Sequence, residues 1–186
     1  MARAKQTELA VLCVLGVQPM TGYAVRAAIR EQLGFFWSES FGQIYPALAE
    51  LERTGLVERH EGARAGSSTY SLTSDGRARL VQLLKEPDAP APRRDGLMLR
   101  LFFGRVLGPD ACRELVERAR DSARQQLAVY ERVRADVESE TAHPEHQAYW
   151  LITISAGEHT ARAAIDWAEE TLASLDGQRE RYTREL

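Results

Sequence analysis

The sequence holds little cysteine, little net charge and no long hydrophobic run. Its two cysteines among 186 residues, Cys13 and Cys112, lie far apart and make neither a disulfide framework nor a paired zinc-ligand pattern. The formal net charge of −3 excludes a strongly basic protein that coats nucleic acid. The apolar stretch from Leu9 to Val17 is too short to cross a bilayer, which takes about 20 residues. These absences predict a reduced, cytoplasmic protein that does not enter a membrane.

Motifs for catalysis are also missing from the sequence. It contains no phosphate-binding glycine loop, no serine nucleophile elbow and no nucleophile–base pair. Five residues invite a metal site, but no sulfur ligand or well-spaced third residue completes it. These five are His143, Glu145, His146, Glu158 and His159. We therefore predict a protein that is not an enzyme and holds neither a metal nor a cofactor.

Hydrophobic periodicity organises the first half of the chain. Thr7 to Val17 is apolar enough for a core helix, and Thr21 can cap a second helix that ends at Gly34. A third helix is expected from Ser40 to Gly55. It buries one face because its apolar residues recur at spacings of four and three. Those residues are Ile44, Leu48 and Leu51.

The periodicity then changes from helical to alternating. Residues 56–61 and 67–72 are short strand candidates around the glycine-rich turn 62–66. Thr73 can then cap a helix that carries Leu80, Leu83 and Leu84 on one side. Three helices followed by a two-stranded ribbon predict a winged helix-turn-helix, whose third helix has the right size to enter a major groove.

A proline-rich segment separates this part from an all-helical second half. We predict a winged-helix domain over residues 1–86, a linker over 87–96 and a helical domain over 97–186, which makes the fold mainly α. The expected helices of the second half run from Leu97 to Leu107, onward from Pro109, and from His143 to about Leu175.

The last two helices carry apolar stripes that need a partner. One stripe recurs along the helix from Pro109, and the other runs along the last helix and is broken by Glu158. The last helix is apolar nearly all round from Ala148 to Ala156, which predicts deep burial there. Such seams suit packing within the chain or across a dimer axis. We favour a homodimer, and the alternative is a monomeric helical bundle.

The segment Phe41-Gly42-Gln43-Ile44-Tyr45-Pro46-Ala47-Leu48, followed by Leu51-Glu52 and Gly55-Leu56-Val57, resembles the PadR family of bacterial winged-helix transcriptional regulators. Further matches in order and spacing are Gly22-Tyr23, Trp37-Ser38 and Tyr70-Ser71-Leu72-Thr73-Ser74-Asp75-Gly76. The second half resembles in outline the shorter C-terminal dimerisation domain of one PadR subfamily. The resemblance implies a homodimer that represses transcription from a pseudo-palindromic operator and is often released by a small, frequently aromatic molecule.

Candidate DNA-contacting residues lie on the third helix, on the wing and near the N-terminus. Gln43 can pair with adenine, and Tyr45 suits a phosphate contact. The alternative is a solvated Gln43 and a packing Tyr45. PadR wings often carry a basic pair just before the tyrosine, where this sequence has hydroxyl side chains. The full set of candidates is Lys5, Ser40, Gln43, Tyr45, Arg64, Ser67, Ser68 and Tyr70.

Aromatic residues of the second half are candidates for an effector cavity at the dimer interface. Their alternative role is core packing, the commoner use of aromatics at helical spacing. The set is Phe102, Phe103, Tyr149, Trp150 and Trp167. Cys112 is predicted to be an inert buried thiol rather than a redox sensor. A winged-helix module that binds protein instead of DNA is the alternative function, which the weakly basic wing keeps open.

Overall fold

The computed structural model describes residues 3–37, 41–62, 68–87 and 95–184. It divides the chain into two compact units, Met1–Ala91 and Pro92–Leu186. The division falls inside the segment predicted as a linker, of which residues 88–94 lie outside the described part.

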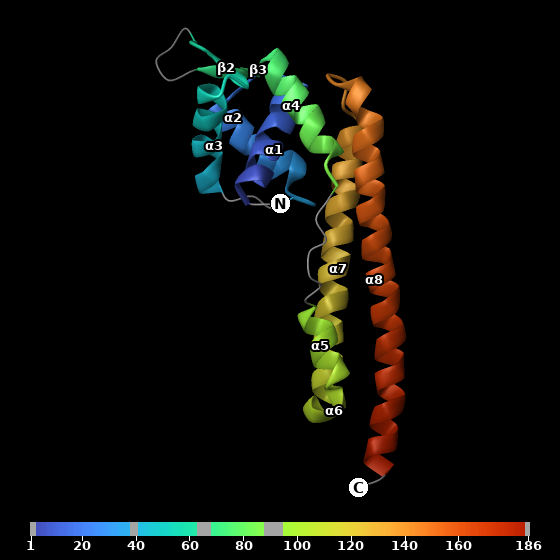
Figure 1. The fold of residues 1–186 in the computed structure, drawn as a ribbon. Coiled ribbons are helices and arrows are strands. Elements are labelled where there is room, and N and C mark those ends of the chain that lie inside the picture. The colour runs from blue at the N-terminus through green and yellow to red at the C-terminus, as the bar shows by residue number, and fades with distance from the viewer. Residues whose placement is uncertain (1–2, 38–40, 63–67, 88–94, 185–186) are drawn as a thin grey trace. The chain divides into compact units, whose positions relative to one another are not determined.

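The first unit combines helices with a small sheet (Figure 1). In chain order its described elements are α1 (Arg3–Val17), β1 (Met20–Thr21), α2 (Gly22–Ala28), η1 (Ile29–Leu33), α3 (Phe41–Arg53), β2 (Val57–His60), β3 (Thr69–Leu72) and α4 (Ser74–Lys85). The segment η1 is π-helical and continues α2, so the predicted second helix is present with a change of winding in its last turns.

Helix α1 supplies the centre of the hydrophobic core. Val11 and Leu12 on α1 are fully buried, and they share one core with Ile44 and Leu48 on α3 and Leu83 on α4. The predicted buried face of α3 is therefore confirmed. On α4, in contrast, Leu84 is 61% exposed, so the predicted leucine face is narrower than the sequence indicated.

Threonine side chains begin two of these helices. The Thr21 hydroxyl accepts a hydrogen bond from the Ala24 backbone N–H at 3.1 Å and caps α2. The Thr73 hydroxyl accepts from the Gly76 N–H at 3.0 Å and also lies 2.8 Å from the Gly55 carbonyl, to which it donates. Thr73 thus ties the start of α4 to the turn that follows α3. Both predicted caps are confirmed.

The sheet has three strands, in the order β1-β3-β2. Strands β2 and β3 form the predicted antiparallel ribbon, with Val57 opposite Leu72. Strand β1 adds an edge that the sequence prediction missed, with Met20 opposite Tyr70. Two residues are too few to show the alternation by which a strand is recognised. The tip of the wing, residues 63–67, lies outside the described residues.

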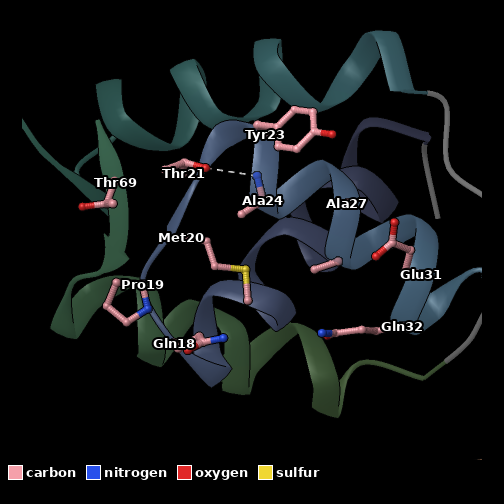
Figure 2. A pocket seen from close by; sticks show the side chains of 11 residues that line it. Gln18, Pro19, Met20, Thr21, Tyr23, Ala24, Ala27, Glu31, Gln32 and Thr69 are labelled. Carbon is pink, nitrogen blue, oxygen red and sulfur yellow. Dashed lines mark hydrogen bonds between the residues drawn. The ribbon is translucent and has the colours of Figure 1, made fainter. Parts of the chain in front are cut away.

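A shallow pocket of about 490 Å³ lies where β1 meets α2 and η1 (Figure 2). Apolar side chains, among them Met20, Ala24 and Ala27, make much of its lining. Polar groups come from Gln32 and from Thr69 on β3. The missed strand β1 therefore also shapes a surface of the first unit.

The second unit is a long helical hairpin with two short helices at one end (Figure 1). Its described elements are α5 (Gly96–Phe102), α6 (Gly104–Leu107), α7 (Pro109–Glu138) and α8 (Pro144–Arg184). The predicted helix from Leu97 to Leu107 is thus two helices separated at Phe103, and the last helix runs past Leu175 to Arg184. Helices α7 and α8 pack along their predicted stripes, with Val116, Ile154 and Ala168 fully buried.

The segment Ala148–Ala156 is less buried than its apolar composition predicts. Ile154 faces α7 and is fully buried, but Tyr149 is 70% exposed and Ile152 65% exposed. The prediction of deep burial all round is therefore wrong for the single chain. The physical reason is that α8 packs mainly against α7, which covers one face of a helix and leaves the others open.

Glu158, which interrupts the apolar stripe of α8, is 5% exposed and bonded across the seam. Arg134 on α7 donates through Nε to Glu158 Oε1 at 2.7 Å and through Nη2 to Oε2 at 3.0 Å. Arg162, one turn further along α8, lies 3.4 Å from Oε2. These two guanidinium groups, Arg134 foremost, hold the pKa of the Glu158 carboxyl below its ordinary value. The interruption is a specific polar contact between the two helices.

Candidate nucleic-acid interface

The face of α3 opposite the core is exposed and carries polar side chains. Residues of an α-helix repeat every 3.6 positions, so the burial of Ile44, Leu48 and Leu51 turns a different set outward. Tyr45 and Glu52 are exposed at the sides of α3, and the set opposite the core is Gly42, Gln43, Pro46, Ala49, Glu50 and Arg53. Three of these six, Gly42, Pro46 and Ala49, are small or apolar. The other three are polar or charged, so this face has few bulky side chains around its polar groups.

Gln43 and Tyr45 occupy the first turns of α3. Gln43 is exposed, as a base-reading residue must be. Tyr45 is 50% exposed, and its ring packs on the start of α2, where a Cβ on Gly22 would lie 3.0 Å from Tyr45 Cε1. Tyr45 is therefore both a packing residue and an accessible one. The packing alternative therefore holds, and the phosphate contact of Tyr45 stays a prediction.

Tyr23 is an exposed aromatic residue that sequence reasoning did not assign to the site. It follows Gly22 at the beginning of α2 and is 73% exposed. Gly22, the residue before Tyr23, packs against the Tyr45 ring, so α2 begins beside α3 at this point. The sequence could have indicated this exposure, because Tyr23 lies two residues before the buried Val25. That spacing places the two side chains on opposite sides of α2.

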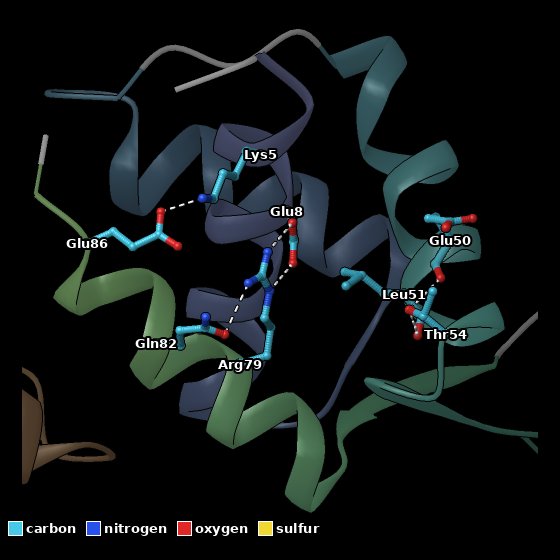
Figure 3. Close-up of polar contacts among 8 residues, drawn as sticks. All are labelled: Lys5, Glu8, Glu50, Leu51, Thr54, Arg79, Gln82 and Glu86. Carbon is cyan, nitrogen blue, oxygen red and sulfur yellow. Dashed lines mark hydrogen bonds and ion pairs between the residues drawn. The ribbon is translucent and has the colours of Figure 1, made fainter. Parts of the chain in front are cut away.

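Glu50 and Arg53 form an ion pair on the outward face of α3. Arg53 Nε donates to Glu50 Oε2 at 2.8 Å, and Arg53 Nη2 donates to Oε1 at 2.6 Å. Figure 3 shows Glu50 on the side of α3 away from Leu51, which points into the core. The hydrogen bonds from Arg53 hold the pKa of the Glu50 carboxyl below its ordinary value, so the pair is fully charged near neutral pH.

The other residues predicted to contact DNA differ in their exposure and in their partners. Lys5 lies on α1 and is ion-paired with Glu86 (Figure 3), so its charge is already partly compensated. Tyr70 is half-buried and packs against the core, while Ser68 is half-buried just before β3. Ser40, Arg64 and Ser67 lie outside the described residues. Of the eight candidates, Gln43 and Tyr45 share the exposed surface of α3.

The five aromatic candidates of the second unit do not gather in one chain. Trp150 and Trp167 are 17 residues apart on α8, which separates them by about 25 Å along the helix. Trp167 packs beside Val116 and Ala168, whereas Trp150 stacks on His146 with ring centroids 5.6 Å apart. Tyr149 is exposed near Trp150. On α5, Phe102 and its neighbour Phe103 form an edge-to-face pair that is exposed to solvent.

His146 and Cys112, from the candidate metal and redox sites, both pack against other groups of the protein. His146 stacks on Trp150, and within the described residues no three His, Cys, Asp or Glu side chains gather as metal ligands would. Cys112 is buried as predicted, with its Sγ 3.6 Å from the Gly104 carbonyl oxygen. Burial raises the pKa of the Cys13 thiol to about 11, which keeps it protonated and unreactive.

The described elements define a class of protein. Three helices, the third with an exposed polar face, and a two-stranded wing make a winged helix-turn-helix. In this chain it is joined to a second unit of long helices. In the described part of the chain, no helix is long and apolar enough to cross a membrane.

Comparison with known proteins agrees with this class at the level of sequence. Residues 11–82 match the family described as transcriptional regulator PadR-like, and residues 93–176 match the family described as virulence activator alpha C-term. The negative transcriptional regulator PadR of Bacillus subtilis is 25% identical over 175 residues, covering 90% of this chain and 96% of that protein. Residues 11–82 therefore form a domain of the PadR-like transcriptional regulator family.

Solved structures share the fold of both units. The virulence activator AphA of Vibrio cholerae has a TM-score of 0.74 at 25% identity, covering 92% of this chain and 99% of that chain. Bacillus subtilis PadR in complex with operator DNA has a TM-score of 0.77 at 22% identity, covering 90% and 98%. The same protein in complex with p-coumaric acid has a TM-score of 0.78 at 22% identity, covering 93% and 97%. The predicted fold class is confirmed.

Proposed function

We propose that this protein is a sequence-specific DNA-binding repressor that acts as a homodimer on a pseudo-palindromic operator. The observation that carries the proposal is the exposed polar face of α3 in a winged helix-turn-helix. One relative supports it in two ways, since the similar Bacillus subtilis protein is named a negative regulator and its structure was solved with operator DNA. Regulation by binding, without catalysis or a cofactor, is part of the proposal.

In this mechanism, α3 enters the major groove and reads base edges. The Gln43 amide can donate to N7 and accept from N6 of adenine in the bidentate pairing that geometry allows for glutamine. The Tyr45 hydroxyl suits a backbone phosphate, and such contacts fix the register of the protein on the duplex. A twofold dimer places two such helices in successive major grooves, about 34 Å apart, which a pseudo-palindromic operator matches.

Exposed apolar side chains on the second unit support the homodimer. On α5 and α6, Phe102 is 84% exposed and Val106 is 87% exposed, while Tyr149 and Ile152 are exposed on α8. Phe102, Phe103 and Val106 lie within a few residues of one another, and exposed apolar side chains that gather on a surface commonly mark an interaction site. A second copy of the chain would cover these side chains and complete the burial that the composition of α8 predicted.

We further propose that a small aromatic molecule releases the operator. The support is the structure of the similar Bacillus subtilis protein with p-coumaric acid, together with the aromatic residues of the second unit. In one chain, Tyr149 and Trp150 lie far along α8 from Trp167, while Phe102 ends α5 and Phe103 follows it. An effector cavity that uses all five therefore requires a second chain.

The test of DNA recognition uses the full chain and DNA from its own upstream region. Fluorescence anisotropy is recorded in a salt titration, with a scrambled duplex of equal length as the reference. We expect tight, sequence-dependent binding of two chains per site, and Gln43→Ala should lower the preference for the operator by about 5- to 150-fold. Gln125→Ala on α7 changes an exposed glutamine of the other unit and should leave binding unchanged.

Equal and weak binding of both duplexes would contradict the proposal. A protein-binding winged-helix module would behave in that way, because nonspecific phosphate attraction alone does not distinguish sequences.

A further inference from the structure

We infer that the Glu50–Arg53 pair on α3 is a guanine-reading device, in which Glu50 holds the Arg53 guanidinium so that its free edge faces one base. This inference rests on the proposed DNA binding and adds a specificity-determining pair to it. A lone carboxylate at position 50 would repel the phosphates of DNA. The geometry of the pair supports a different role.

The hydrogen bonds between the two side chains occupy one edge of the guanidinium. An arginine side chain has five N–H donors in a rigid planar fork. Arg53 uses its Nε and one N–H of Nη2 for the two Glu50 oxygens, at 2.8 Å and 2.6 Å. The remaining edge, formed by Nη1 and the second N–H of Nη2, has no other partner among the described residues. That edge matches the O6 and N7 acceptors of guanine, the commonest specific arginine contact in the major groove.

The position of Arg53 suits this contact. Counting 100° per residue around α3, Arg53 and Pro46 lie at the centre of the outward face, directly opposite Ile44 and Leu48. Ala49, one turn before Arg53 on the same face, is small, so Glu50 is the long side chain of α3 that lies beside the fork. Arg53 is 70% exposed and Glu50 59% exposed, which leaves the pair accessible to DNA.

Charge explains why the pair serves specificity rather than affinity. The Glu50 carboxylate cancels the charge of Arg53, so the pair contributes little to phosphate attraction. Because Glu50 already fixes the orientation of the Arg53 guanidinium, that group loses less conformational entropy when it binds one base. Gln43 lies ten residues before Arg53, which is about 15 Å along the helix or at most about four base pairs. The two side chains therefore read different positions of one half-site.

The experiment selects binding sites from a randomised duplex library with the full-length chain and sequences the bound DNA. Wild-type protein is compared with Arg53→Lys, Glu50→Ala and the exchanged pair Glu50→Arg/Arg53→Glu. Arg118→Ala is the matched control, because Arg118 is paired with Glu114 on the exposed surface of α7 with similar side-chain exposure. Circular dichroism confirms that each variant is folded.

We expect wild-type protein to select a guanine at one position of each half-site. Arg53→Lys should lower the preference for that guanine by about 5- to 150-fold and leave the other positions unchanged, because lysine lacks the fork. Glu50→Ala should weaken the same preference yet steepen the salt dependence by about 0.9, since the released arginine can reach a phosphate. The exchanged pair should keep an ion pair between positions 50 and 53 but should not select guanine at that position of the half-site.

Two different results would overturn the inference, and they distinguish its own failure from the failure of the proposed function. If wild-type protein selects a clear consensus and every variant selects it equally well, then Glu50 and Arg53 are an ordinary surface pair. If wild-type protein selects no consensus, the proposed function itself fails and the inference falls with it.

Discussion

At the scale of single residues, the packing of the second unit depends on small side chains at defined points. Tyr130 on α7 is buried against α8 at Gly157, where a Cβ would lie 2.2 Å from Tyr130 Cζ. The ring therefore occupies the space that any other residue would fill. Glycine here serves a close approach, since α8 is helical through this position.

Gly157→Ala should destabilise the protein because the added methyl group overlaps the Tyr130 ring. We expect a loss of roughly 1–3 kcal/mol, the range for overpacked cores. Gly177→Ala on the same helix is the control. A Cβ there meets nothing within 4 Å, so better helix propensity should stabilise the protein slightly. Urea unfolding followed by circular dichroism measures both, and equal midpoints for the two variants would contradict the clash.

The Glu158 carboxylate predicts a pH dependence of stability. Its bonds to Arg134 and Arg162 keep its pKa lower in the folded state than in the unfolded state. The unfolded chain therefore binds the proton more readily, and stability is lost as the pH falls from about 4.3 through the folded pKa.

Glu158→Gln should flatten the stability profile in this acid window and lower stability at pH 7. Urea midpoints between pH 3 and 7 test this, with Glu169→Gln as the control for an exposed cross-helix pair with Arg124. A profile for Glu158→Gln that runs parallel to the wild-type profile would show that the buried pair is not the cause.

At the scale of elements, the junction between α3 and α4 depends on one side chain. Thr73 caps α4 and also holds the Gly55 carbonyl at 2.8 Å, whereas Thr21 caps α2 through a single bond at 3.1 Å. Gly55 has a φ of 71°, a backbone conformation that glycine adopts at no steric cost and that ends α3 before β2 begins. The wing therefore starts from a turn that Thr73 fixes.

Thr73→Ala should cost more stability than Thr21→Ala. Loss of a cap costs about 1 kcal/mol, and Thr73 additionally leaves the Gly55 carbonyl without its donor. Thr160→Ala is the control, because the Thr160 hydroxyl bonds only within α8, to Ala156, and alanine favours a helix. Thermal unfolding ranks the three variants, and a Thr21 variant less stable than the Thr73 variant would contradict the argument.

At the scale of the whole molecule, the proposed dimer assigns a role to the apolar side chains exposed on the second unit. Phe102→Lys/Val106→Lys should shift the protein from two chains toward one chain of 20.8 kDa in sedimentation equilibrium. Both side chains are more than four-fifths exposed in the single chain, so the variant should remain folded. Val81→Lys, which changes a half-exposed valine of the first unit, should leave the association unchanged. A double variant that stays dimeric would place the interface elsewhere.

Local structure and the resemblance of the first unit to PadR-like regulators follow from the sequence alone. Helix faces, caps and the wing follow from short-range rules, so Ile44, Leu48, Thr21 and Thr73 were assigned correctly without coordinates. The motif around Gln43 and Tyr45 likewise marked α3 as the candidate reading helix.

The tertiary structure decided which distant residues meet and which faces stay open. Strand β1 exists because β3 offers it a partner, and two residues carry no pattern of their own. Glu158 meets Arg134 across 24 positions of sequence, and α7 covers one face of α8 while Tyr149 stays exposed. Local periodicity reports which residues share a face of an element, but burial depends on what packs against that face.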